Sequence, residues 1–155
     1  MSDASVFQEL TEIGLAVEDL DTALAKFSAV FGDPAEIVES SEAGIQMRYS
    51  SVGVGGRRIN LYQDVSEGKG PVGRSIKRRG EGFFNAIIIV DDLDVAMERM
   101  RAAGVEFVEP QPRVFTKGTY NGRRYDSHRI IWTHPASFHG CLLEIQEWDW
   151  EPEGQ

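Results

Sequence analysis

The chain has 155 residues, which is enough for one ordinary domain with a hydrophobic core. Its 25 Asp and Glu residues exceed its 16 Lys and Arg residues, and this acidic balance argues against nucleic acid as a main partner, because phosphate neutralisation needs basic surface. No apolar run approaches membrane-spanning length and the N-terminus has no secretory pattern, so we expect a cytoplasmic protein without a membrane partner. The single cysteine, Cys141, excludes an internal disulfide and is expected to be a small core residue.

The first half of the chain predicts one helix and four strands. An apolar run over residues 13–17 predicts the opening strand. Apolar side chains at helical spacing from Leu20 to Val30 predict a helix that begins after an N-cap at Asp19 and stops at Gly32. Three further strands are predicted over residues 35–38, 45–52 and 58–62.

The second half repeats this order. An apolar run over residues 86–90 predicts a strand, and the apolar stripe from Leu93 to Ala103, with Asp92 as its N-cap, predicts a helix. Further strands are predicted over residues 105–108, 129–133 and 141–147. Residues 111–127 have no counterpart in the first half, and we expect them to form a long polar loop that reaches over a cleft.

A duplication explains this order, because residues 17–27 and 90–100 follow the same pattern position by position. The repeat predicts an α+β fold of two tandem β-α-β-β-β modules, whose curved mixed sheet surrounds a cleft. We expect a single domain over residues 1–155, with module one at about 9–64, a linker with a short helix (72–77) at 65–82, and module two at about 83–149.

Several segments also carry a family pattern. They are Glu12–Leu20, residues 70–82 of the linker, residues 84–90 followed by Asp91-Asp92, and His134-Pro135 followed by Leu143-Glu144-Ile145. With these segments the chain resembles the vicinal oxygen chelate superfamily of glyoxalase and bleomycin-resistance-like proteins, and most closely its methylmalonyl-CoA epimerases. The resemblance implies a glyoxalase-like fold, a small carbonyl or acyl-CoA ligand and a homodimer.

The resemblance also implies a metal position that has lost its histidines. In such epimerases four strand residues bind one divalent metal ion, and two of them are histidines. The matching positions are Glu12, Asn60, Asn85 and Glu144, and the family's base falls at Met47. Because zinc and similar ions favour imidazole and thiolate ligands, we expect no metal or other cofactor. If these four residues hold a metal, weakly bound Mg²⁺ or Ca²⁺ suits their oxygen atoms.

The same four residues attract attention without any resemblance, because polar side chains inside apolar strands are costly unless they are bonded or paired. They form either a site or a self-satisfied polar cluster. As a site, Glu12 and Glu144 would be the catalytic acid and base, while Asn60 and Asn85 would bind a carbonyl oxygen or hold the carboxylates. His128 is a third catalytic candidate. Further substrate-binding candidates, which are otherwise core aromatics, are Tyr49, Tyr62 and Trp132.

Two functions remain open on this basis. The first is an isomerase, epimerase or lyase that moves a proton next to a carbonyl or acyl thioester without a transition metal. The second is a non-catalytic protein of the same fold that binds or sequesters a small molecule.

Overall fold

The computed structural model describes residues 5–41 and 46–154. Residue 45, where one predicted strand begins, lies outside the described residues. The chain divides into two compact units, which are treated separately. The central unit is Thr11–Ala86, and the terminal unit combines the described residues up to Leu10 with those from Ile87 onwards. Within the described residues, no helix combines the length and apolar character that a membrane crossing requires.

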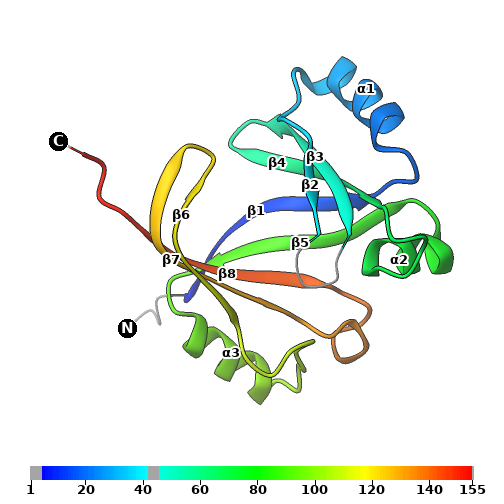
Figure 1. Cartoon of the computed structure of the whole chain (residues 1–155). Helices are drawn as coiled ribbons and strands as arrows, with labels where there is room; N and C mark the ends of the chain where they lie inside the picture. Colours follow the sequence, from blue (N-terminus) through cyan, green and yellow to red (C-terminus); the bar gives the residue numbers. More distant parts are fainter. Residues whose placement is uncertain (1–4, 42–45, 155) are drawn as a thin grey trace. The chain divides into compact units, whose positions relative to one another are not determined.

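The central unit carries the elements of the first module (Figure 1). They are β1 (Phe7–Ala16), α1 (Leu20–Phe31), β2 (Val38–Ser40), β3 (Met47–Val54), β4 (Arg57–Asp64) and α2 (Pro71–Arg79). The strands follow the order β2-β3-β4-β1, in which β3 and β4 are antiparallel and β1 and β4 are parallel. Helix α1 packs on one face of these strands, where its buried Leu20 and Leu24 meet Val52 and Leu61.

The terminal unit carries the second module. Its elements are β5 (Gly82–Val90), which starts in the central unit, α3 (Leu93–Ala102), β6 (Arg113–Tyr120), β7 (Arg123–Trp132), the short 3₁₀ helix Pro135–Ser137 and β8 (Leu143–Trp150). The strand order is β5-β8-β7-β6. Helix α3 packs its buried Leu93, Met97 and Met100 against Ile131 and Ile145. Together the parallel and antiparallel pairs confirm the predicted α+β class with a mixed sheet.

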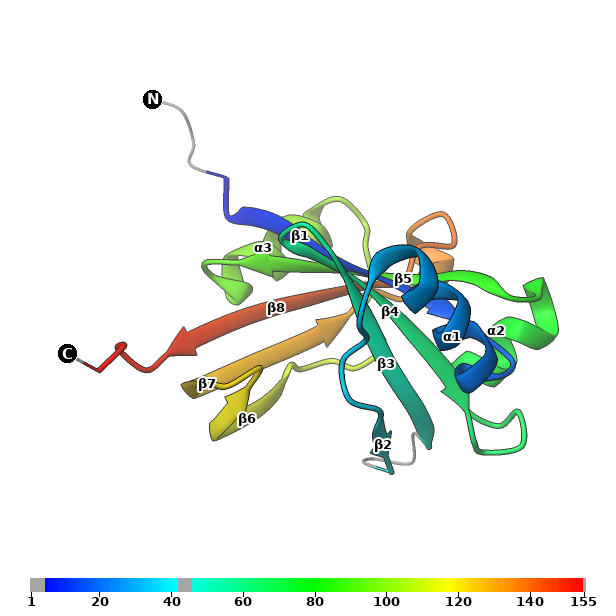
Figure 2. The same ribbon diagram turned by 90° about the horizontal axis from the view of Figure 1, so that it is seen from above.

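The expected polar loop over residues 111–127 is wrong, because this segment forms most of the β6–β7 hairpin (Figure 2). Tyr120 pairs with Arg123, so the loop has only two residues, Asn121 and Gly122, with φ of 49° and 78°. Two positive φ angles are the signature of a type I′ hairpin turn, which Asn-Gly favours. The ladder has no pair at Lys117, whose φ is 52°, although the register of β6 and β7 is the same on both sides of this residue.

Two smaller predictions also need correction. Residues 105–108 form no strand and contribute one isolated bridge, Phe107 to Thr133, so β6 takes the place of the second strand in module two. Cys141 is exposed rather than buried, because it follows the turn at His139 and Gly140 and precedes the first residue of β8.

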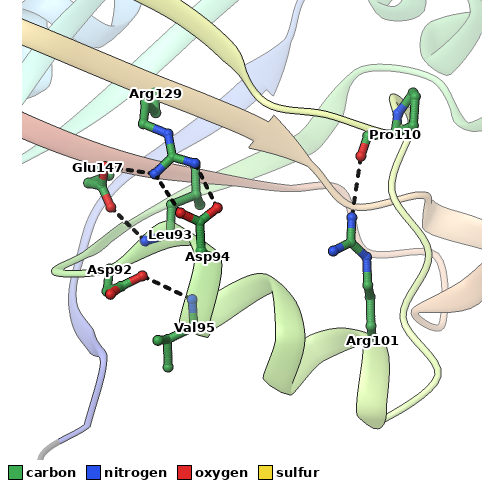
Figure 3. Close-up of polar contacts among 8 residues, drawn as sticks. All are labelled: Asp92, Leu93, Asp94, Val95, Arg101, Pro110, Arg129 and Glu147. Atoms are coloured by element: carbon green, nitrogen blue, oxygen red, sulfur yellow. Dashed lines mark hydrogen bonds and ion pairs between the residues drawn. The ribbon is translucent and has the colours of Figure 1, made fainter.

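The N-terminus of α3 is fixed by side chains from β7 and β8 (Figure 3). The Leu93 N–H donates to Glu147 Oε2 at 2.7 Å, which satisfies one of the first-turn amides that have no partner inside the helix. Arg129, paired with Glu147 across the strands, bonds both Glu147 at 3.1 Å and Asp94 at 2.7 Å. The Arg129 guanidinium lowers the pKa of Asp94. Asp92 caps the helix through the Val95 N–H at 3.0 Å.

Equivalent contacts hold α1 in the central unit. The Leu20 N–H donates to Gln63 Oε1 at 2.9 Å, and Arg48, the cross-strand partner of Gln63, bonds Asp21 at 3.2 Å. Asp19 caps this helix through the Thr22 N–H at 2.8 Å. The helix amide contact, the arginine–aspartate pair and the aspartate cap therefore each occur in both units, and these two sets are the helix-docking contacts.

The first prediction tests the docking of α3. Glu147→Ala should lower the free energy of unfolding by about 1–3 kcal/mol, because the Leu93 N–H loses its acceptor and Arg129 loses one of its two. Asp149→Ala, which removes an exposed carboxylate from the same strand, should change it by less than about 0.5 kcal/mol. Urea unfolding followed by circular dichroism measures both, and equal effects would show that the helix does not depend on Glu147.

Candidate active site

The central unit brings Glu12 and Asn60 together in its interior. Both side chains are 8% exposed. Asn60 Nδ2 donates to Glu12 Oε2 at 2.7 Å and to the Tyr62 hydroxyl oxygen at 3.1 Å. The parallel register of β1 and β4 causes this contact, since Gly14 lies opposite Asn60 and every second side chain of each strand points to the same face. Both N–H groups of the Asn60 amide are thereby used, so Asn60 holds Glu12 in place.

Asn85 lies beside the same residues, in β5. A Cβ atom on Gly14 would come within 2.0 Å of Asn85 Oδ1 and 2.4 Å of Tyr62 Cε2, so only glycine leaves room for these two side chains. Asn85 is 3% exposed, and its Oδ1 atom has no hydrogen-bond partner. A buried acceptor without a donor is costly, and a ligand N–H or O–H group would relieve that cost.

Tyr62 links this polar contact to the core of the central unit. Its ring lies 5.9 Å from Tyr49 and 5.9 Å from Phe84, and Val72 of α2 packs in the same cluster. The predicted substrate-binding residues Tyr49 and Tyr62 are therefore both part of a core cluster, while the Tyr62 hydroxyl also contacts Asn60.

The terminal unit places Glu144 among donors from β7 and β8. Glu144 Oε2 accepts from Trp132 Nε1 at 3.1 Å, and Oε1 accepts from Gln146 Nε2 at 2.6 Å. The Gln146 carbonyl oxygen in turn accepts from Trp148 Nε1 at 2.9 Å. Trp132 pairs with Glu144 across the strands, so the predicted catalytic residue and the predicted substrate-binding indole are in direct contact.

His128 lies in an aromatic stack on the same two strands. Its ring is parallel to Trp148 with a centroid distance of 3.3 Å, and the ring of Trp148 lies 4.4 Å from Trp150. His128 is 7% exposed, and its Nε2 atom has no hydrogen-bond partner. Burial lowers the pKa of His128 to about 4, so at physiological pH the imidazole is neutral rather than the imidazolium that a histidine acid requires.

The hydrogen bonds of Glu12, Asn60, Asn85 and Glu144, which the resemblance matches to metal ligands, do not suit a transition-metal ion. Asn60 directs one N–H group at Glu12 and the other at the Tyr62 hydroxyl oxygen, and an N–H group cannot bind a cation. Asn85 Oδ1 lies against Gly14, and both oxygens of Glu144 accept N–H groups. No imidazole or thiolate is among them. Throughout residues 5–41 and 46–154, no group of three or more His, Cys, Asp or Glu side chains is arranged to share an ion.

Three residues of these contacts were not predicted from the sequence, namely Gly14, Gln146 and Trp148. Gln146 and Trp148 follow Glu144 at intervals of two along β8, a spacing that places all three on one face. A groove of about 490 Å³ lies beside α1, and none of the predicted site residues lines it. Its walls include Leu15, Val17, Glu18, Lys26, Phe27 and Glu81.

The second prediction concerns acid stability. The folded-state pKa of His128 is about 4 and its unfolded value is about 6.5, so the unfolded chain binds a proton first. As the pH falls from about 6.5 towards 4, the wild type should lose about 1–3 kcal/mol of stability that His128→Phe does not lose. Urea unfolding at several pH values measures the difference. His139→Asn, at an exposed position, should keep the wild-type slope, and an unchanged slope in His128→Phe would contradict the burial effect.

The third prediction concerns metal content. Because the donor groups are amides and N–H-bonded carboxylates, the purified protein should carry far less than one zinc, iron, cobalt or nickel ion per chain. Elemental analysis by mass spectrometry measures this, with Glu144→Ala as the comparison. About one such ion per wild-type chain, lost in the variant, would contradict the prediction, whereas weak Mg²⁺ or Ca²⁺ binding would not.

Comparisons with known proteins agree with the fold. Residues 11–122 match the Glyoxalase/Bleomycin resistance protein/Dioxygenase superfamily. The chain is 23% identical over 142 residues to an ethylmalonyl-CoA/methylmalonyl-CoA epimerase of Cereibacter sphaeroides, which covers 89% of this chain and 96% of that protein. It superposes on methylmalonyl-CoA epimerase from Mycobacterium tuberculosis with a TM-score of 0.73 at 28% identity, over 95% of this chain and 92% of that one.

A Streptomyces coelicolor methylmalonyl-CoA epimerase variant, solved in complex with 2-nitronate-propionyl-CoA, has the same fold. Its TM-score is 0.69 at 23% identity, over 91% of this chain and 97% of that one. The chain therefore belongs to the Glyoxalase/Bleomycin resistance protein/Dioxygenase superfamily, with a glyoxalase-like α+β fold and a distant similarity to methylmalonyl-CoA epimerases.

Proposed function

We propose that this protein binds a small acyl thioester or related carbonyl compound and moves a proton on the carbon beside the carbonyl group. The observation that carries the proposal is the Glu12 carboxylate, which lies buried in a strand and is held there by an amide N–H of Asn60. Burial of a carboxylate is costly, and an enzyme gains from it when the group must exchange protons with a substrate. The acyl-CoA names of the similar epimerases support the substrate class.

The proposed chemistry uses two carboxylates. One of Glu12 and Glu144 takes the proton as the carbon–hydrogen bond breaks, and the electron pair moves onto the carbonyl oxygen as an enolate. Return of a proton from a carboxyl group to the opposite face of that carbon gives the epimer, and return to another atom gives an isomer. Asn85 is proposed to bind an N–H or O–H group of the substrate, since its buried amide oxygen has no hydrogen-bond donor. No metal takes part in these steps.

The position of Met47 favours a second function. The resembled epimerases carry a carboxylate base at the position of this thioether, which cannot take a proton. A chain without that base suits a protein that binds or sequesters its ligand, with Tyr49, Tyr62 and Trp132 as binding surfaces. The homodimer and the cytoplasmic location expected from the sequence remain predictions beside either function.

The fourth prediction separates these functions. Glu12→Gln and Glu144→Gln should each slow proton exchange about a hundredfold to ten-thousandfold, because each removes a group that accepts or returns a proton. Exchange of the hydrogen beside the carbonyl is followed by NMR in deuterated water, over a panel of acyl-CoA thioesters that includes methylmalonyl-CoA and ethylmalonyl-CoA. Glutamine keeps the size of the side chain and one acceptor oxygen, so both variants should remain folded, and thermal unfolding followed by circular dichroism checks this.

Two exposed positions on the same strands serve as controls. Glu9→Gln in β1 and Asp149→Asn in β8 should leave exchange at the wild-type rate. Exchange that survives in the Glu12→Gln/Glu144→Gln double variant would remove both groups from the mechanism. Wild-type protein that binds a thioester without exchanging its hydrogen would establish the binding function instead.

A further inference from the structure

We infer that Trp132 and Gln146 are positioning residues for the Glu144 carboxylate, and that Trp148 sets the orientation of Gln146. This inference rests on the proposed function and deepens it, because it names the groups that prepare one of the two proposed carboxylates. It also names the hydrogen-bond donors of a carboxylate whose counterpart in the resembled family binds metal.

The donors reach Glu144 from two directions. Trp132 lies directly across from Glu144 in the β7–β8 ladder, and its indole N–H meets Oε2 at 3.1 Å. Gln146 is two residues further along β8, on the same face, and its amide N–H meets Oε1 at 2.6 Å. Each oxygen of the carboxylate is thereby fixed by its own neutral donor, while a carboxylate oxygen has a second lone pair that can still accept a proton.

The orientation of Gln146 follows from the chemistry of its other neighbour. An indole N–H can only donate a hydrogen bond, so the Gln146 atom that faces Trp148 Nε1 at 2.9 Å must be the carbonyl oxygen. The amide nitrogen must then face Glu144. The Trp148 ring is stacked parallel to the rings of both His128 and Trp150, and the Tyr125 ring stands edge-on to it at 5.2 Å. Aromatic packing thus sets the direction in which Gln146 donates.

The equivalent place in the central unit shows that this set of donors is specific to a carboxylate. The repeat aligns Glu144 with Asn60 and Gln146 with Tyr62, and the cross-strand partner of Asn60 is Ser51, where Glu144 has Trp132. Asn60 donates to its neighbours, and it accordingly faces the carboxylate of Glu12 and the hydroxyl oxygen of Tyr62. Glu144 only accepts, and both of its named neighbours donate. The donor Asn60 is therefore surrounded by acceptors, and the acceptor Glu144 is surrounded by donors.

The network is tested first without any assay of activity. The chain has three tryptophans, so the ¹H–¹⁵N spectrum should contain three indole signals. Glu144→Met should shift the Trp132 signal upfield because its acceptor is lost, and Gln146→Met should shift the Trp148 signal in the same way. The Trp150 signal should stay within the range that neighbouring packing changes produce. If neither the Trp132 nor the Trp148 signal moves in these folded variants, the network and the inference are overturned.

The second test asks whether the network serves turnover. A hydrogen bond to a charged group contributes about 1.5–3 kcal/mol, so Trp132→Phe and Gln146→Met should each lower kcat for proton exchange about 10- to 100-fold. KM should change little, because neither residue is proposed to hold the substrate through these contacts. Trp148→Phe keeps an aromatic ring in the stack but removes the indole N–H, so it should reproduce part of the Gln146→Met loss. Trp150→Phe, the same exchange in the same stack, should keep the wild-type kcat.

The outcomes of the two tests separate this inference from the proposed function. Wild-type protein that exchanges no hydrogen with any thioester refutes the proposed function, while the indole signals still decide whether Glu144 is held by Trp132 and Gln146. If Glu144→Gln abolishes exchange and Trp132→Phe and Gln146→Met retain the wild-type kcat, the proposed function stands and the positioning roles are refuted.

Discussion

The helix-docking contacts are the constraint on which each unit depends. A helix that begins directly after a strand exposes backbone N–H groups that need acceptors, and Leu20 and Leu93 both find theirs on the last strand of their module. Gln63 and Glu147 provide the acceptors, and the arginine paired with each one bonds the first-turn aspartate of the helix. The contact thereby fixes where the helix starts, and it fixes the register of the two strands that carry it.

Because successive side chains of a strand point to opposite faces, the helix-docking contacts also determine the face on which the candidate site residues lie. Gln63 is three residues after Asn60, and Glu147 is three residues after Glu144, so the docking residue and the site residue lie on opposite faces of one strand. A slip of one residue in β4 or β8 would move both to the wrong face at once. The polar contacts of Glu12 with Asn60, and of Glu144 with Trp132, are therefore set by the same register that holds the helices.

The sequence predicts the repeated elements well because their signals are local. Apolar spacing, the aspartate caps and the polar residues inside apolar runs are all visible along the chain, and the caps at Asp19 and Asp92 are confirmed. The β6–β7 hairpin was missed although Asn121-Gly122 is a strong local turn signal, because the long polar segment around it favoured a loop. Gly14 and Gln146 could not be recognised as partners of Asn85 and Glu144, since their roles depend on which strands lie side by side.

The backbone conformation of Lys117 has a consequence for how this protein behaves in a concentrated solution. Strand β6 stands at the end of the strand order in the terminal unit, and it exposes Val114 and Phe115. A straight apolar strand in that position offers its free backbone groups to any other chain, which is how edge-to-edge aggregation begins. The missing ladder pair at Lys117 and its positive φ make this strand locally irregular, and Lys117 places an exposed cationic side chain on it. Lysine is a residue type that edge strands use against such pairing, so Lys117 opposes edge-to-edge association at this hairpin.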